Sequence, residues 1–86
     1  MSKKLPEKAA KSSDRKILSP LGAHIRKWRK KKGYSSSDDF AIKHNLGESW
    51  YGDIERGYID IQFTTLDRIV NALGISHEEF FSGFKK

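Results

Sequence analysis

Residues 33–57 read GYSSSDDFAIKHNLGESWYGDIERG and carry the signals of two short helices joined by a tight turn. The first helix is predicted from about Ser37 to His44, because Ser36 is followed three residues later by Asp39. At this spacing the serine hydroxyl and the carboxylate accept hydrogen bonds from the free amides of a helix start. Asn45 tolerates the left-handed backbone that a helix end often needs, so the chain is expected to turn there.

The second helix is predicted from about Glu48 to Arg56, where Gly57 ends it. Two short helices joined by so small a turn cannot lie side by side; they cross steeply and one of them faces outward. Small domains use this geometry to place a helix in the major groove of DNA. Residues 48–56 are therefore the expected recognition helix.

The chain has 86 residues and no cysteine, which predicts one small domain held together by helix packing alone. Neither disulfides nor a cysteine-ligated zinc site can stabilise it. No apolar run approaches the length of a membrane span, and the polar N-terminus lacks the apolar segment of a signal peptide. We expect a soluble cytoplasmic protein without membrane contact.

The positive charge of the chain is unevenly distributed. Seventeen Lys and Arg against eleven Asp and Glu give a formal net charge of +6. Residues 1–16 carry six basic and two acidic groups, whereas residues 17–84 carry nine of each. Within that neutral part, six of the seven residues from Arg26 to Lys32 are basic. A neutral domain with one basic stretch indicates a directed surface for a polyanionic partner.

A helix is also expected before residue 33. Ser19-Pro20 predicts its start, because a capping hydroxyl is followed by proline at the first helical position. It should run to about Lys32 and end at Gly33. Leu21, Ile25 and Trp28 fall on one face of it.

Two more helices are expected after residue 57. One runs from about Phe63 to Leu73, and its predicted buried face consists of Phe63, Leu66, Ile69, Val70 and Leu73. Ser76 and Glu79 form a second capping box that opens a short fifth helix. The sequence therefore predicts an all-α, compact five-helix domain.

Residues 1–17 are predicted to be a disordered basic tail, and residues 18–86 the folded domain. Up to about Lys16 the only bulky apolar residue is Leu5, so the segment cannot bury enough surface to offset its ordering entropy. Two roles for this tail stay open: a DNA-contacting arm that adds phosphate contacts, or a solubilising tail.

Many residues along the chain match one known family. They are Arg29, Gly33-Tyr34, Phe40-Ala41, Leu46, Tyr51, Ile54-Glu55-Arg56-Gly57, Leu66, Ile69 and Leu73-Gly74-Ile75-Ser76. Through them roughly residues 19–84 resemble the helix-turn-helix domain of the phage repressor and Cro family, also called the XRE family. The resemblance implies a lambda repressor-like fold and a transcription regulator that binds double-stranded DNA sequence-specifically. It also implies a homodimer on a near-palindromic site.

By this resemblance the start of the second helix supplies the base contacts. The candidates are Glu48, Ser49 and Asp53, with Trp50 alongside. Glu48 could accept from a cytosine amino group, and Trp50 could pack on a thymine methyl group. Different roles for both residues stay open: Glu48 could complement the dipole of its own helix, and Trp50 could belong to a protein-binding surface.

Phosphate contacts are expected from the basic end of the first helix. Basic residues suit a helix C-terminus, but six in seven exceed what the helix dipole requires. We therefore favour a phosphate-facing role. The candidates are Lys27, Arg29, Lys30, Lys31 and Lys32, together with Ser37 at the start of the next helix.

The resemblance also implies an ion pair between Arg29 and Glu55. Such a pair would clamp the first helix to the recognition helix, and the remaining donors of the arginine could reach a phosphate. Removing one partner of a buried pair destabilises a protein by more than the intact pair stabilises it.

The sequence leaves one alternative to a DNA-binding protein open. An acidic recognition helix with Trp50 also suits a protein-interaction module, such as an antitoxin or an adaptor for a polymerase or regulator. An enzyme is not expected, because the sequence has no nucleophile elbow and no glycine-rich phosphate loop. Its three histidines, His24, His44 and His77, show no metal-ligand spacing, so neither a metal nor a cofactor is expected.

Overall fold

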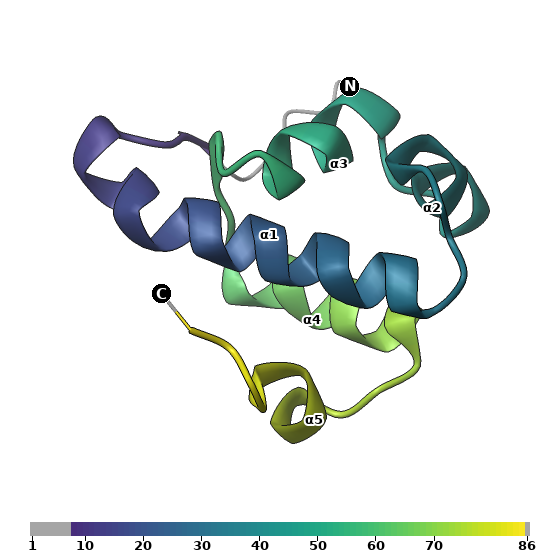
Figure 1. Cartoon of the computed structure of the whole chain (residues 1–86). Coiled ribbons are helices and arrows are strands. Elements are labelled where there is room, and N and C mark those ends of the chain that lie inside the picture. The colour runs from purple at the N-terminus through teal and green to yellow at the C-terminus, as the bar shows by residue number, and fades with distance from the viewer. Residues whose placement is uncertain (1–7, 86) are drawn as a thin grey trace.

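The computed structural model describes residues 8–85 of the chain, with Lys8 described by its backbone only. Five helices pack into one body, and two short strands pair at its edge (Figure 1). The elements are β1 (Lys8–Ala9), a 3-10 helix η1 (Ser12–Asp14), α1 (Arg15–Lys31), α2 (Ser37–Lys43), α3 (Glu48–Glu55), β2 (Ile59–Asp60), α4 (Phe63–Leu73) and α5 (His77–Phe81). The predicted five-helix fold is confirmed. Within residues 8–85, no helix is both long and apolar enough to cross a membrane.

The predicted caps and turn of the helix-turn-helix are present. The Ser36 hydroxyl accepts a hydrogen bond from the Asp39 amide at 2.9 Å. Asn45 has φ 59°, the left-handed conformation expected between α2 and α3. At α5 the Ser76 hydroxyl accepts from the Glu79 amide at 3.0 Å. Local side chains therefore set the start of two helices and the turn between the two that form the motif.

The start of α1 differs from the prediction. The helix begins at Arg15, and Pro20 lies inside it rather than at its first position. Proline has no amide hydrogen, so the Lys16 carbonyl loses its intrahelical partner, but this gap lies close to the helix start. The extension is held by contacts that the local sequence does not show: Arg15 binds backbone carbonyls at residues 56 and 57.

The segment before α1 is also ordered where it is described. Of the expected tail, residues 1–7 lie outside the described part of the chain. Residues 8–17 form β1, η1 and the first turn of α1. β1 pairs antiparallel with β2, so that Lys8 lies opposite Asp60 and Ala9 opposite Ile59.

One hydrophobic core joins all five helices. Its buried residues are Ile25, Phe40, Ala41, Leu46, Tyr51, Ile54, Leu66, Ile69, Val70, Leu73, Ile75 and Phe80. The prediction for Phe63 was wrong, since this side chain is 65% exposed. It is the first residue of α4, where its ring stacks on His77 at the surface, with ring centroids 5.5 Å apart.

Helices α1 and α3 cross at close range. A Cβ atom on Gly22 would come within 3.0 Å of the carbonyl oxygens of Ile54 and Glu55. One turn earlier in α1, Ser19 lies against Gly57, which follows α3 and has φ 79°. A Cβ atom on Gly57 would come within 3.0 Å of the Ser19 backbone. Both positions need glycine, because a side chain there would force the two helices apart.

Candidate nucleic-acid interface

Arg29 and Glu55 connect α1 to the end of α3. The Arg29 Nε donates to Glu55 Oε2 at 2.8 Å, and its Nη2 donates to Glu55 Oε1 at 3.0 Å. The third guanidinium nitrogen donates to the Tyr34 carbonyl at 2.8 Å. The Tyr51 hydroxyl donates to the same carboxylate at 2.5 Å. This network holds the recognition helix on α1 and is nearly closed to solvent, with the two charged side chains 4% and 7% exposed.

Raised pKa values keep the Arg29 guanidinium and the Tyr51 hydroxyl protonated. The hydrogen bond from Arg29 to Glu55 raises the pKa of the guanidinium above its usual value, although burial opposes this shift. Burial, followed by the hydrogen bond to Glu55, raises the pKa of Tyr51 well above its usual range. Both groups are therefore protonated donors to the Glu55 carboxylate under ordinary conditions.

Arg29 does not fit its expected second role as a phosphate contact. The residue is only 3% exposed, and each of its three side-chain nitrogens donates to a protein oxygen. This corrects the prediction: burial assigns Arg29 to the clamp with Glu55.

The four candidate base-contacting residues lie together with Ser37 around one open hollow. This hollow opens between the N-terminal ends of α2 and α3. Its lining consists of Ser37, Asp38, Gly47, Glu48, Ser49, Trp50, Gly52, Asp53 and Arg56. Two helix starts thus present polar side chains to the same volume, as a motif that reads base edges requires.

Within this hollow the candidates differ in exposure. Glu48 and Ser49 are exposed. Trp50 is half-buried and packs against the hydrophobic core, and its buried Nε1 has no hydrogen-bond partner among residues 8–85. Asp53 accepts from Arg56 at 3.0 Å, so its charge is balanced by a neighbouring cation. The acidic character of α3 is therefore concentrated in Glu48.

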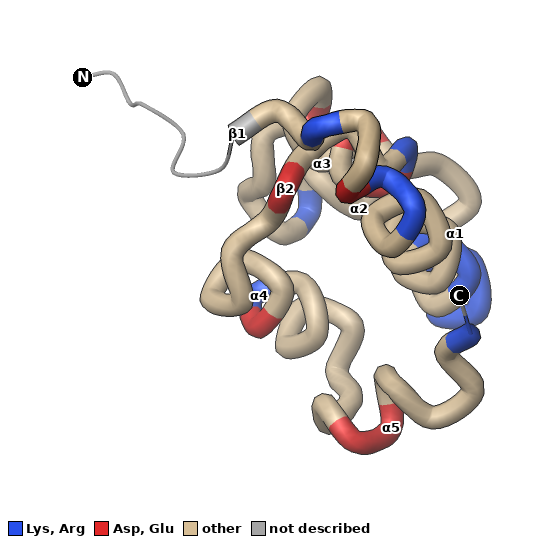
Figure 2. Tube along the Cα trace, turned by 90° about the vertical axis from the view of Figure 1, so that its left-hand side faces the viewer, with Lys and Arg blue, Asp and Glu red and all other residues tan. Residues whose placement is uncertain are grey.

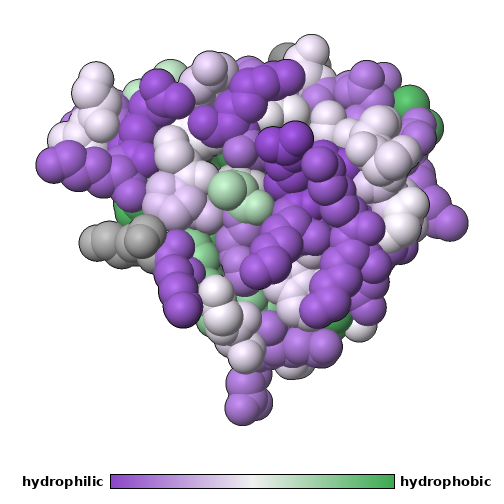
Figure 3. Space-filling view, viewed as in Figure 1, coloured by the Kyte–Doolittle hydropathy of each residue, from purple (hydrophilic) through white to green (hydrophobic). Residues whose placement is uncertain are grey.

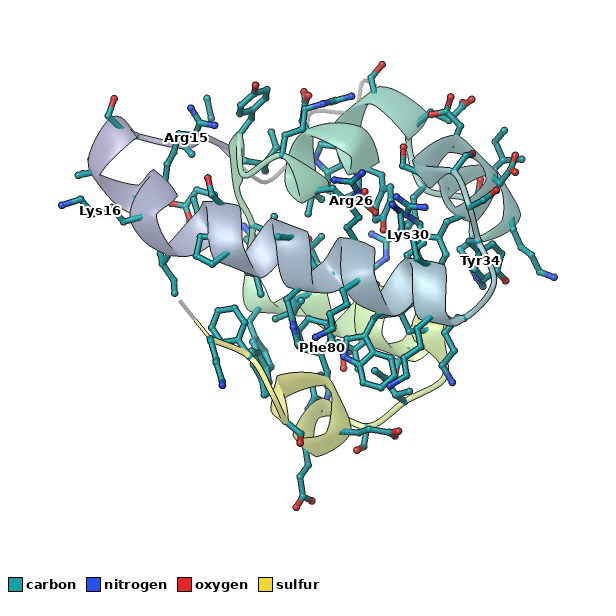
Figure 4. The ribbon with its side chains drawn as sticks, in the orientation of Figure 1. Arg15, Lys16, Arg26, Lys30, Tyr34 and Phe80 are labelled. Atoms are coloured by element: carbon teal, nitrogen blue, oxygen red, sulfur yellow. The ribbon has the colours of Figure 1, made fainter. Side chains whose placement is uncertain are left out.

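The basic residues of α1 divide between two sides of the helix. Arg26 and Lys30, which are four residues apart, lie on the side that faces α3 and α2 (Figure 4). Lys31 lies on the other side, with its Nζ 4.7 Å from the ring centre of Trp28. There it lines a shallow hollow shared with Glu78 and Glu79 of α5. Lys27 and Lys32 are both exposed, and neither lines one of these hollows.

Two cations that were not among the predicted DNA contacts lie beside the helix-turn-helix. Arg26 and Arg56 line a second hollow next to the first, together with Arg29, Ser37, Gly52 and Glu55. Arg26 belongs to the basic stretch, and its spacing of four from Lys30 was the signal that could have placed both on one face.

The surface around α1 is mainly charged or hydrophilic. In Figure 2, Lys and Arg positions follow α1, whereas α5 carries acidic positions. The face seen in Figure 3 is covered mainly by hydrophilic residues with few apolar patches. Among residues 8–85, no group of three His, Asp or Glu side chains could hold a metal ion.

The fold and this site define a helix-turn-helix domain. A family model described as helix-turn-helix matches residues 25–80. The chain belongs to this family, which is made up of DNA-binding regulators. The resemblance inferred from the sequence is thereby confirmed.

Individual members of the family are similar over most of the chain. The control protein C.MunI from Mycoplasma sp is 34% identical over 66 residues, which are 77% of this chain and 89% of that protein. The restriction-modification controller protein C.Esp1396I, solved as a tetramer in complex with its natural 35 base-pair operator, is 32% identical with a TM-score of 0.69. That match covers 77% of this chain and 86% of the other. The controller protein C.AhdI from Aeromonas hydrophila is 28% identical with a TM-score of 0.68, over 78% of this chain and 96% of the other.

Proposed function

We propose that this protein is a transcription regulator that binds double-stranded DNA at a specific sequence. One observation carries the proposal: the starts of α2 and α3 share an open polar hollow that is flanked by Arg26 and Arg56. The likeness to an operator-bound controller protein supports it. It acts by occupying DNA in the cytoplasm and is not an enzyme.

In this proposal α3 enters the major groove with its N-terminal end. Ser49 and Glu48 meet base edges, and a glutamate there prefers the amino group of cytosine. Trp50 adds an apolar contact at the rim of the hollow, and the ion pair with Arg56 keeps Asp53 from repelling the DNA. Phosphate contacts come from Arg26, Lys30 and Ser37, and from Lys27 and Lys32 where the duplex extends to them.

A two-fold dimer on a near-palindromic site is part of the proposal, since C.Esp1396I binds its operator as a tetramer. Of the three phenylalanines near the C-terminus, Phe80 is fully buried and Phe81 is 40% exposed. Phe81 is therefore the one that offers most apolar surface to a second copy. Two relatives are restriction-modification controller proteins, so the genes of such a system are the first candidates for regulation.

In vitro selection from random duplexes tests the function. We expect enrichment of one sequence with two-fold symmetry. Binding to random duplex should also weaken steeply as salt rises, because phosphate contacts release counterions. Absence of binding even at low salt would contradict the proposal and favour a protein partner, such as a toxin or a polymerase.

The two sides of α1 predict different effects of charge removal. Arg26→Ala and Lys30→Ala should each weaken DNA binding and reduce the slope of log affinity against log salt by about 0.9 for each phosphate that is no longer neutralised. Lys31→Ala removes the same charge from the side near α5 and should leave the slope unchanged. If Lys31→Ala changes the slope as much as Lys30→Ala, the effect of a cation on DNA binding does not depend on which side of α1 it occupies.

A further inference from the structure

Arg15 binds the backbone at the point where the chain leaves the recognition helix. Its Nε donates to the Gly57 carbonyl at 3.3 Å, and its Nη2 donates to the Arg56 carbonyl at 3.4 Å. The guanidinium also lies over the Tyr58 ring, with Cζ 4.5 Å from the ring centre. Three consecutive residues after α3 are thus contacted by one side chain of α1.

Arg15 places a positive charge near the C-terminal end of α3, where the helix itself has none in its last turn. The last carbonyls of a helix have no intrahelical partner and carry the negative end of its dipole. In α3 the Asp53 and Ile54 carbonyls accept from the Tyr58 and Gly57 amides, but the last turn contains no basic residue to complement the dipole. Arg15 brings a cation to this helix end from a distant part of the chain.

The backbone around Arg15 holds the same point. The Ala10 amide donates to the Tyr58 carbonyl at 2.8 Å, and β1 pairs with β2 just beyond it. On the other side of Arg15, Ser19 lies against Gly57. Residues 8–19, which we call the N-terminal strap, therefore contact the segment that follows α3 at several positions. The strap precedes residues 25–80, the span that the family model matches.

We propose that Arg15 is a positioning residue for DNA recognition: through it, the N-terminal strap fixes the C-terminal end of α3 and so aims its N-terminal end at the bases. An eight-residue helix is about 12 Å long, so a tilt of about 10° at one end moves the other by about 2 Å. Hydrogen bonds to base edges do not survive a displacement of that size. This inference rests on the proposed DNA-binding function.

The test compares Arg15→Ala with Lys16→Ala. Lys16 is the exposed neighbour, which points to a different side of α1 (Figure 4), so its removal deletes the same charge without touching α3. Arg15→Ala should weaken binding to the selected duplex on the order of tenfold. Its affinity for random duplex and its salt slope should match those of Lys16→Ala. Equal weakening on both duplexes with a slope reduced by about 0.9 would show a phosphate contact and overturn the positioning role.

Amide hydrogen exchange in the free protein adds a measurement that needs no DNA. The amides of Gly57 and Tyr58 donate to the Ile54 and Asp53 carbonyls of α3. Both should exchange faster in Arg15→Ala and at the normal rate in Lys16→Ala. Unchanged exchange in Arg15→Ala, with DNA binding by the wild type intact, would overturn the role of Arg15 alone. Failure of the wild type to bind any duplex would instead overturn the proposed function.

Discussion

Glu55→Ala is expected to lower the free energy of unfolding by about 3–5 kcal/mol, because it leaves the Arg29 guanidinium buried without its counter-charge. The Tyr51 hydroxyl loses its acceptor in the same variant. A small domain has only about 5–15 kcal/mol of stability in total, so the melting temperature should fall steeply. Urea denaturation with circular dichroism measures the loss.

The matched control is Asp53→Ala, which removes an acid two residues earlier in the same helix. Its ion pair with Arg56 is exposed, and exposed pairs contribute about 0–1 kcal/mol. Glu55→Gln keeps an acceptor but removes the charge and should fall between the two. If Glu55→Ala melts like Asp53→Ala, the clamp does not stabilise the domain. At a temperature where Glu55→Ala is folded, we also expect weaker DNA binding, because α3 is no longer fixed to α1.

The second large effect is expected from Gly22→Ala. In an open helix this change stabilises by about 1 kcal/mol, since alanine has the higher helix propensity. Here the new methyl group would overlap backbone oxygens of Ile54 and Glu55, which cannot rotate away. Overpacking of this kind destabilises by about 1–3 kcal/mol or more, so the sign of the effect should reverse.

Gly52→Ala provides the comparison for Gly22→Ala. It is the same substitution within α3, but its Cβ would meet only the end of the Arg56 side chain, which can move. We expect unchanged or slightly raised stability for Gly52→Ala in the same melting experiment. A Gly22→Ala variant as stable as Gly52→Ala would mean that α1 and α3 are not in close contact.

The helix-turn-helix was predictable because its signals are local. Ser36, Asn45 and Gly57 act on backbone atoms within a few residues, so their effect on the chain does not depend on the rest of the fold. The same holds for Ser76 at α5. The candidate base-contacting residues followed from the resemblance to the repressor family, and the structure gathers them around one hollow.

The predictions for the start of α1 and for Arg29 were wrong because contacts with residues distant in the sequence determine both. Ser19-Pro20 is a valid local start signal, but Arg15 gains contacts with residues 56–58 and extends α1 beyond it. Phosphate contact was expected of Arg29 from its place in a basic stretch, whereas its burial depends on where Glu55 and Tyr34 lie in three dimensions. Which side of α1 each lysine occupies follows from helical spacing once the neighbours of the helix are known.

The exposure of Glu48 and Ser49 has a consequence for how such a regulator acquires new targets. Neither side chain belongs to the core or to the clamp between Arg29 and Glu55, and surface substitutions usually change stability by less than about 0.5 kcal/mol. A library randomised at these two positions should therefore yield folded proteins that prefer different operators. In a host with several such regulators, substitutions at these two positions would be enough to give each regulator a different operator preference.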